Sequence, residues 1–336
     1  MLTAARVKRL LGAAAKARVL VIGDLMLDQF IWGRVTRISP EAPVPVLEFE
    51  RESFMPGGAA NVARNLASLG IQTTLFGVTG KDAAASQLRD LLRAEQVDCG
   101  GLMAVAGRMT TRKVRLVAQQ QQVARVDRET AGEVAPADLR RLLGRLRRRL
   151  DGVDAVIVGD YGKGVVSQAL LDELRAECRV RGIWLSLDPK PVHQLNLAGL
   201  SLITPNRKEA FELVGRKDPG KVEDPLKDKA LCEVVRALIR DLGPALLLVT
   251  LGEQGMLLCR GDGQPSVIPT VAQEVFDVSG AGDTVIATMT LGVAAGASPL
   301  EAAVLANHAA GVVVGKVGTA VVTPAELLAS FKPRGA

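Results

Sequence analysis

The segment that decides the fold is Asp277-Val-Ser-Gly-Ala-Gly-Asp283-Thr284. An alternating apolar segment, Val267 to Val275, precedes it, and a long uncharged run, Val285 to Ala297, follows it. This order predicts a strand, a tight glycine turn and a buried helix. Gly280 and Gly282 permit backbone conformations that other residues avoid, and they let a ligand approach the peptide plane closely.

The start of the predicted helix offers free backbone amides, which favour an anion such as phosphate. Asp283 places a carboxylate where that anion would bind, so a simple phosphate cradle is a poor interpretation. A base beside an anion hole suits phosphoryl transfer, because the base accepts the proton of an attacking hydroxyl while the amides stabilise the transferring charge. The structural alternative is that Asp283 caps a helix after an ordinary glycine turn.

The composition is that of a globular protein that can bury a large core. The 336 residues fit one large α/β domain or two small ones, and 48% are hydrophobic and 23% charged. Much of the net charge of +6 lies in Arg140 to Arg149, where leucines mark a buried face opposite the arginines. No aromatic residues are interleaved with these charges, so we expect a solvated face and no nucleic-acid partner.

The cysteines and apolar segments exclude several other classes. The four cysteines are scattered without a C-x-x-C pair and the chain has two histidines, so neither a zinc site nor a disulfide framework is expected. No secretion signal is evident. The uncharged run after Asp283 contains glycines and meets Pro299, which indicates a core helix and not a membrane span. We expect a cytoplasmic protein without a membrane partner.

Several buried strands are predicted to end in polar residues. Asp24 and Asp160 follow continuous apolar runs, Lys163 comes shortly after, and Lys190 follows a third such run. Ligands of open α/β sheets bind at the carboxyl ends of the strands. The two lysines therefore suit an anionic substrate, and structural salt bridges between the Asp and Lys side chains are the alternative.

Two β-rich segments, at about residues 31–50 and 107–127, interrupt the alternation of strands and helices. The first contains three prolines between Ile38 and Phe49, which confine its strands to sheet edges. Together the two segments predict a small sheet that projects from the main body. The remaining alternation predicts a mostly parallel sheet with crossover helices.

The motif from Asp277 to Asp283 resembles the signature of the ribokinase-like (PfkB) carbohydrate kinases. The resemblance runs from about residue 18 to about residue 325, with four motifs in the expected order. It implies one kinase domain over residues 1–336, built as an α/β three-layer αβα sandwich with a central mostly parallel sheet and the small sheet as a lid. It also implies that Asp283 is the catalytic base and that the amides of Gly280, Ala281 and Gly282 form the anion hole.

The resemblance implies a sugar site and a nucleotide site as well. Met55-Pro-Gly57-Gly58-Ala-Ala-Asn61 matches the family's sugar-binding motif, and an Asp at the end of the first strand holds sugar hydroxyls in the family. Asn206-Arg-Lys-Glu209 resembles the motif that organises Mg²⁺, held by Glu209 through water, and the phosphates of ATP. The implied positions are Asp24, Gly57, Gly58 and Asn61 for the sugar, and Asn206, Glu209, Thr250, Gly252, Gly255 and Asn307 for the nucleotide.

Three stretches resemble one branch of this family, the heptose 7-phosphate kinases that make D-glycero-β-D-manno-heptose 1,7-bisphosphate for ADP-heptose and lipopolysaccharide. They are Gly23 to Gly33, Arg37 to Val46 and Asp160 to Gly164. In many bacteria that kinase is fused to an adenylyltransferase with an H-x-G-H motif. His193 and His308 cannot form it, so we expect a kinase alone.

A phosphorylated sugar needs cations to receive its charge. The candidates are Arg112, Lys113, Arg115 and Arg125 on the lid strands, with Lys163 and Lys190 near Asp160 at the sheet ends. The resemblance further implies a homodimer through the lid. It leaves a monovalent cation site near Asp277 open, because Ser279 replaces the commoner Thr.

Three alternatives to this interpretation remain. Another sugar or sugar-phosphate kinase of the same fold, such as a ribose or fructose phosphate kinase, is the closest. An NAD-binding dehydrogenase is disfavoured, because no G-x-G-x-x-G follows the first strand. A non-catalytic binding protein is disfavoured by the intact Asp283, Asn206 and Glu209.

Overall fold

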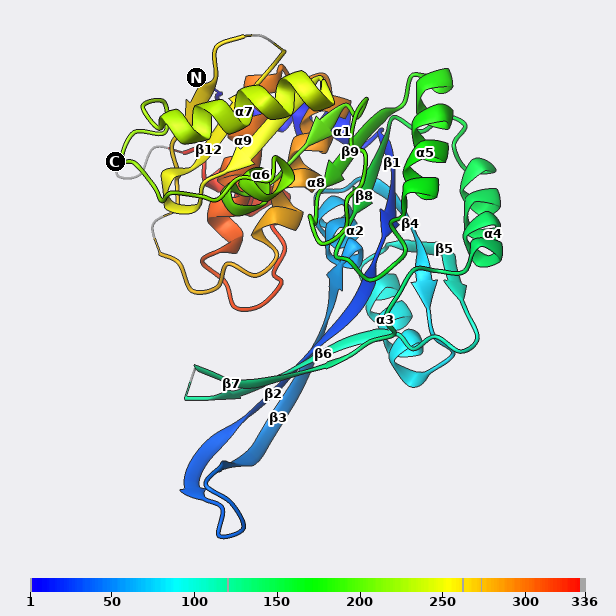
Figure 1. Ribbon diagram of the computed structural model, residues 1–336, viewed down its shortest axis with the longest axis vertical. Helices are drawn as coiled ribbons and strands as arrows, with labels where there is room; N and C mark the ends of the chain where they lie inside the picture. Colours follow the sequence, from blue (N-terminus) through cyan, green and yellow to red (C-terminus); the bar gives the residue numbers. More distant parts are fainter. Residues whose placement is uncertain (1, 120, 262, 273, 333–336) are drawn as a thin grey trace.

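The computed structural model describes residues 2–119, 121–261, 263–272 and 274–332, and its centre is a nine-stranded sheet (Figure 1). From β11 to β5, neighbouring strands run parallel, while β12 and β13 add an antiparallel edge. In spatial order the strands are β13 (Ser266–Ile268), β12 (Met256–Cys259), β11 (Leu246–Thr250), β10 (Leu202–Ile203), β9 (Trp184–Asp188), β8 (Ala155–Gly159), β1 (Arg18–Gly23), β4 (Gln72–Thr79) and β5 (Asp98–Ala104).

Helices cover both faces of this sheet, so its central strands are apolar on both sides. The predicted three-layer αβα sandwich with a mostly parallel sheet is therefore confirmed. One layer contains α4 (Pro136–Arg147), α5 (Gln168–Arg181), α6 (Arg207–Leu213) and α7 (Lys229–Leu242). The other contains α1 (Ala4–Ala14), α2 (Ala59–Ser68), α3 (Ala83–Ala94), α8 (Ala281–Ala294), α9 (Pro299–Val313) and α10 (Pro324–Ala329).

The arginine-rich helix α4 packs as its pattern predicts. Its leucines are buried in the core, while Arg147 pairs with Glu173 and Glu177 of the neighbouring α5. Part of the basic charge is thus neutralised within the protein. None of the helices described by the structure is long and apolar enough to cross a membrane.

A second, four-stranded sheet projects from the main body, at the bottom of Figure 1. Its order is β3-β2-β6-β7, with β2 (Leu25–Ile38), β3 (Pro45–Gly58), β6 (Thr111–Ala118) and β7 (Gln121–Arg128). The strands differ in extent from the predicted 31–50 and 107–127 segments, of which residue 120 lies outside the described part. Strand β2 starts directly after Asp24, and β3 continues to Gly58 at the start of α2. The projecting sheet is therefore rooted beside the predicted sugar-binding residues.

The segment before the glycine motif differs from the prediction of a strand. Strand β13 ends at Ile268, and Val271 and Val275 lie in an irregular connection. Pro269 follows the strand and has no N–H to continue the ladder. The chain then leaves the sheet edge and reaches α8 in the helical layer, which a continuous strand would not allow.

Candidate active site

The glycine motif starts α8 as predicted, and Gly280 has a left-handed backbone with φ of 79°. An ideal Cβ on Gly280 would lie 2.6 Å from Nδ2 of Asn61, so glycine lets α8 approach α2 closely. Within the predicted anion hole, the amide of Ala281 donates to the carbonyl of Val278 at 3.2 Å. The amide of Gly282 belongs to the first helical turn, where intrahelical acceptors are lacking. The helix start is thus suited to bind an anion.

Asp283 lies in the first turn of α8 and is 7% exposed despite its charge. Asn61 Nδ2 donates to Asp283 Oδ2 at 2.7 Å, and the hydroxyl of Tyr161 donates to Asp283 Oδ1. Burial raises the pKa of Asp283 to about 6, against the lowering effect of these two donors, and the charge of Asp28 raises it further. A carboxylate with this pKa is suited to act as a base near neutral pH.

Asn61 is held in place by its neighbours on α2 and in the C-terminal segment. Arg64 Nη1 lies 3.4 Å from Asn61 Oδ1 and donates to the carbonyl of Thr319 at 2.9 Å. Its Nε pairs with Glu95 at 2.6 Å. Because Asn61 Oδ1 faces the guanidinium, Nδ2 faces Asp283. The structure thus brings together two predicted site residues from distant parts of the chain.

Asp24 lies at the carboxyl end of β1 and is 1% exposed. Its carboxylate accepts the backbone amides of Tyr161 (2.9 Å), Lys163 (2.8 Å) and Val165 (2.9 Å). These bonds order the turn after β8. The predicted contact of Asp24 with sugar hydroxyls stays a prediction.

The other strand-end residues have partners within the protein. Burial raises the pKa of Asp160 to about 6, and its carboxylate lies 3.0 Å from His193 Nε2. Lys163 Nζ pairs with Glu129 at 2.7 Å. These two strand-end residues therefore have separate partners within the protein, and their contact with a substrate stays a prediction.

The Asn206 and Glu209 motif forms a capping box at the start of α6. Asn206 Oδ1 accepts from Glu209 N, and Glu209 Oε2 accepts from Asn206 N, both at 3.0 Å. Glu209 Oε1 lies 3.2 Å from Lys190 Nζ. Lys190, predicted to bind substrate, therefore lies beside the predicted nucleotide motif.

Asp188, at the end of β9, connects the two predicted halves of the site. Burial raises its pKa well above the ordinary value, and the charges of Glu209 and Asp283 add to this effect. Thr204 donates to Asp188 Oδ1 at 2.9 Å. An ideal Cβ on Gly282 would lie 3.8 Å from Asp188 Oδ2, which places this acid beside the glycine motif.

The remaining nucleotide-side residues gather near the end of β11. Thr250 forms a parallel bridge with Asn206, so the two motifs lie next to each other. Gly252 and Gly255 flank the short helix η1 (Gly252–Gln254) with positive φ values of 63° and 83°. Asn307 is buried on α9 and donates to the carbonyl of Pro269 at 2.7 Å. It thereby ties α9 to the segment after β13.

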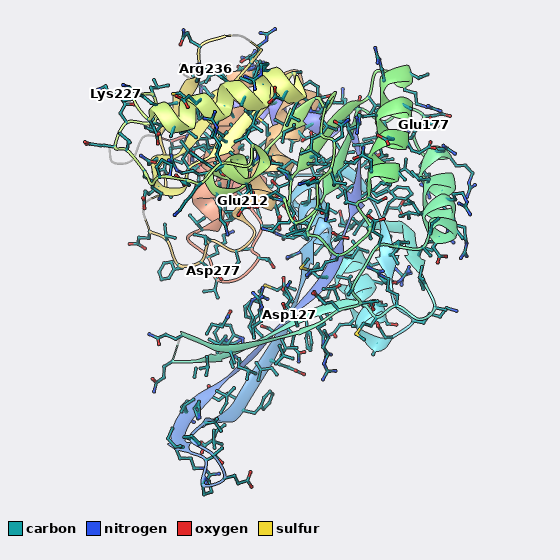
Figure 2. All side chains as sticks on the ribbon, viewed as in Figure 1. Asp127, Glu177, Glu212, Lys227, Arg236 and Asp277 are labelled. Carbon is teal, nitrogen blue, oxygen red and sulfur yellow. The ribbon has the colours of Figure 1, made fainter. Side chains whose placement is uncertain are left out.

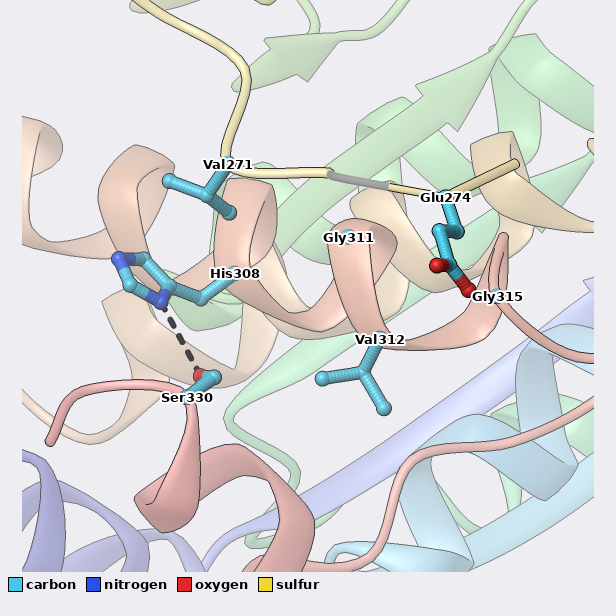
Figure 3. A pocket seen from close by; sticks show the side chains of 7 residues that line it. All are labelled: Val271, Glu274, His308, Gly311, Val312, Gly315 and Ser330. Atoms are coloured by element: carbon cyan, nitrogen blue, oxygen red, sulfur yellow. Dashed lines mark hydrogen bonds between the residues drawn. The ribbon is translucent and has the colours of Figure 1, made fainter. Parts of the chain in front are cut away.

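A hollow of about 370 Å³ lies between α9 and this segment (Figure 3). His308 lies in its wall, where Nδ1 is 3.0 Å from Ser330 Oγ and the ring stacks on Phe331. His308 is therefore a packed residue. The lining residues are Val271, Glu274, His308, Gly311, Val312, Gly315 and Ser330.

The loop of Asp277 faces the projecting sheet that carries Asp127 (Figure 2). Asp277 Oδ1 accepts the amide of Ser279 at 2.9 Å, and Oδ2 accepts the amide of Gly318 at 3.0 Å. Burial would raise the pKa of Asp277, but these hydrogen bonds and the charge of Arg115 lower it. Asp277 thus orients the glycine loop through these two backbone amides.

The register of the projecting sheet separates its basic residues onto two faces. Asp28 pairs with Lys113, and Phe30 with Arg115, so these side chains share one face. Arg112 lies on the other face. There, burial would raise the pKa of Asp82, but hydrogen bonds from Thr110 and Ala85 and the charge of Arg112 lower it.

The face of Asp28 is the one that looks toward the glycine motif. The charge of Asp28 raises the pKa of Asp283. Met55, which pairs with Asp28 between β2 and β3, contacts Thr319 of the main body. Arg115 Nη1 binds Asp28 Oδ1 at 2.5 Å. Arg115 thus lies closer to the candidate base than Arg112 does.

Two residues of this site were missing from the predicted set. Tyr161 and Asp188 both follow or end buried strands, next to residues that were predicted. Their positions in the sequence could have indicated them. Tyr161 is the only tyrosine in the chain, and it comes directly after Asp160, which was predicted.

Comparison with known proteins decides the family. Residues 16–326 match the pfkB family of carbohydrate kinases. The chain belongs to this family. It is therefore an ATP-dependent carbohydrate kinase, and the predicted relationship is confirmed.

Curated relatives are similar to nearly the whole of this chain. The chain is 43% identical over 319 residues to the bifunctional protein HldE of Desulfatibacillum aliphaticivorans, covering 95% of this chain and 64% of that protein. It is 45% identical over 319 residues to the bifunctional protein HldE of Caulobacter vibrioides, covering 94% and 64%. The chain thus spans less than two thirds of these relatives.

Solved structures share the fold at low sequence identity. Phosphofructokinase-2 of Escherichia coli, in complex with potassium, superimposes with a TM-score of 0.77 at 21% identity, covering 94% of this chain and 98% of that one. Ribokinase of Arabidopsis thaliana, complexed with ribose and ATP, gives a TM-score of 0.74 at 19% identity, covering 94% and 99%. These likenesses establish a ribokinase-like fold.

Proposed function

We propose that this kinase phosphorylates the anomeric hydroxyl of D-glycero-β-D-manno-heptose 7-phosphate to give the 1,7-bisphosphate. The similarity to HldE proteins and the three stretches that resemble the heptose 7-phosphate kinases support this substrate. The observation that carries the chemistry is Asp283, a buried carboxylate with a pKa of about 6 at a glycine-rich helix start.

In the proposed mechanism, Asp283 accepts the proton of the C1 hydroxyl as that oxygen attacks the γ-phosphoryl group of ATP. The helix start at Gly280 and Gly282 stabilises the negative charge on the transferring group, while the amide of Ala281, the third predicted donor, is bonded to the carbonyl of Val278. Asn61 orients the base through its 2.7 Å hydrogen bond. As the bond between the C1 oxygen and the γ-phosphorus forms, the bond from that phosphorus to ADP breaks, and ADP leaves.

Mg²⁺ fits this site as an ion held chiefly by the nucleotide. No cluster of three or more acidic, His or Cys side chains suited to a metal is found among the described residues. Glu209 has one oxygen on its capping box and the other near Lys190, so a contact through water suits it better than direct ligation. When bound with ATP, Mg²⁺ would neutralise phosphate charge. We include a monovalent cation near Asp277 in the proposal, to be tested by activity with and without K⁺.

In this proposal, the 7-phosphate binds to cations on the face of the projecting sheet that carries Asp28. Lys113 and Arg125 share Asp127 at 3.1 Å and 2.9 Å, and Arg115 lies beside them on the same face. These three cations exceed the acids Asp28 and Asp127 with which they pair. We therefore assign the phosphate to Lys113, Arg115 and Arg125, in place of Arg112.

Replacing Arg115 by Gln should raise KM for heptose 7-phosphate by about tenfold or more, because a charge-assisted contact with the phosphate is lost. The KM for ATP should stay within about twofold. The matched control is Arg112→Gln, which removes the same charge from the opposite face and should leave both constants near the wild-type values. Equal effects of the two substitutions on KM for the sugar would contradict the assignment.

The proposed substrate is tested by ADP release from Mg-ATP with heptose 7-phosphate, ribose, fructose and fructose 6-phosphate in parallel. Selective turnover of the heptose phosphate is the expected result. Turnover of ribose or fructose phosphate, with none of the heptose phosphate, would favour the alternative of another sugar kinase on this fold and remove the role in lipopolysaccharide synthesis.

The projecting sheet also suits the proposed homodimer. Apolar side chains near its tip are exposed, with Phe49 at 65% and Ile38 at 60%. Contiguous exposed apolar surface is typical of an interaction site. Sedimentation equilibrium of the purified protein should give the mass of two chains, and a monomer at high concentration would exclude this proposal.

A further inference from the structure

Tyr161 connects two buried carboxylates of the site. Its hydroxyl donates to Asp283 Oδ1, and its backbone amide donates to Asp24 Oδ2 at 2.9 Å. The mechanism above uses Asp283 as the base and gives Tyr161 no role. Tyr161 is half-buried, and a phenol that donates to a candidate catalytic carboxylate has a role to be explained.

The phenol ring lies against two glycines. An ideal Cβ on Gly58 would lie 3.3 Å from Cδ2 of Tyr161, and one on Gly159 would lie 3.2 Å from its Cε2. The ring therefore packs against main chain from β3 and β8, where side chains would crowd it. Close packing of this kind restricts ring rotation.

The main chain of Tyr161 is fixed as well. Asp24 accepts three amides from the turn that Tyr161 begins, so the position of the ring is set by a buried carboxylate and not by packing alone. The phenol is thus preorganised toward Asp283, which is how a supporting residue holds a reacting group in geometry.

We infer that Tyr161 is a positioning residue that, together with Asn61, holds the Asp283 carboxylate ionised and oriented toward the acceptor hydroxyl. This inference rests on the proposed role of Asp283. A carboxylate has about four lone-pair sites, so two donors leave room for a substrate hydroxyl. The substrate proton goes to Asp283, because burial, with the charges of Asp283 and Asp188, raises the pKa of Tyr161 well above its ordinary value and keeps the phenol protonated.

The electrostatic surroundings explain why donors are needed here. Negative charge dominates around Asp283, and burial also favours its neutral form. The two neutral donors, Asn61 and Tyr161, oppose both effects because their hydrogen bonds stabilise the ionised carboxylate. The charged groups around the site are Asp28 on β2, Asp188 at the end of β9, Asp24 after β1 and Glu209 on α6, with Arg64 on α2, Arg115 on β6 and Lys190 after β9.

The first test is the pH dependence of Tyr161→Phe, which keeps the ring and removes its hydroxyl. Without this donor, the acid limb of the kcat/KM profile should move upward by about one pH unit, with about tenfold lower activity below pH 6 and a smaller loss above pH 8. A purely structural role would lower activity equally at all pH values, or leave the profile in place. Either outcome would overturn the inference.

The matched control is Thr290→Val. This substitution removes a buried hydroxyl from α8, the helix that carries Asp283. Thr290 Oγ1 lies 2.8 Å from Ser186 Oγ, about two helical turns from Asp283. This variant should lose stability and keep the wild-type pH profile. A shift in the pH profile of Thr290→Val would show that removing a hydroxyl that does not bond Asp283 has the same effect. That result would overturn a specific role for Tyr161.

The second test needs no substrate. Because Tyr161 is the only tyrosine, protein labelled with 3-fluorotyrosine gives a single ¹⁹F resonance. In the wild type this resonance should titrate with a midpoint near 6, the pKa of Asp283, and in Asp283→Asn the step should vanish. A wild-type resonance that is flat between about pH 4 and pH 8 would refute the contact.

These readouts separate the inference from the proposed substrate. If heptose 7-phosphate is not accepted, the ¹⁹F titration still reports the contact, and the pH profile is measured with the sugar that the wild type does accept.

Discussion

Asp283→Asn should lower kcat by at least about 10²-fold, because the amide cannot accept the proton of the attacking hydroxyl. KM for ATP and for the sugar should change much less, since the side chain keeps nearly the same shape. Initial-rate measurements of ADP release at pH 8 give both constants. Turnover close to the wild-type value would refute the assignment of Asp283 as the base.

The same variant should fold at least as stably as the wild type at pH 8. The pKa of Asp283 is about 6 in the folded protein and near 4 when unfolded, so folding disfavours its ionised form. Stability from this group is full below about pH 4 and is lost as the pH rises through about 6. Because Asn carries no charge, it avoids this loss. Thermal unfolding at pH 4 and pH 8 measures the difference, and a lower Tm for the variant at both would mean that its lost activity reflects misfolding.

Gly280→Ala should lower kcat by about 10²-fold and also reduce stability. With φ at 79°, a non-glycine residue is strained by about 1–2 kcal/mol, and the new Cβ would meet Asn61 Nδ2 at 2.6 Å. Either Asn61 or the start of α8 must then move, and a displacement of about 1 Å at a reacting group costs about 10²-fold in rate. Steady-state kinetics and thermal unfolding check both effects.

Gly296→Ala is the matched control for this prediction. Gly296 follows α8 with a similar φ of 76°, and no atom lies within 4 Å of its ideal Cβ. The substitution should cost similar stability and leave kcat near the wild-type value. If the two variants lost activity equally, backbone strain alone would explain the result and the contact with Asn61 would not matter.

Local patterns were enough to predict the architecture. Continuous apolar runs such as Val19 to Ile22 became central parallel strands, because a strand covered on both faces needs apolar residues at every position. The spacing of leucines in α4 marked its buried face. The strand expected through Val271 and Val275 was wrong, because alternation over a few residues does not reveal where a chain must leave a sheet.

The glycine motif pointed to the candidate base for a similar reason. A helix start with Gly280 and Gly282 is a local feature, and Asp283 stands within it, so its chemistry could be argued from neighbouring residues. The resemblance pointed to Asn61 as a sugar-binding residue, and only the structure places its Nδ2 2.7 Å from Asp283.

The sequence by itself thus determined the layered fold and the family, and it marked Asp283 as the candidate base, because these inferences depend on motifs and patterns within single segments of the chain. Only the tertiary structure decided that Tyr161 contacts Asp283, that Asp24 holds the turn of Tyr161, and that Arg115 instead of Arg112 faces the site. Those contacts join strands and helices far apart in sequence, and a shift of one residue in strand register would reverse the last of them. Pairing between distant elements is set by packing of the whole chain, which no single segment encodes.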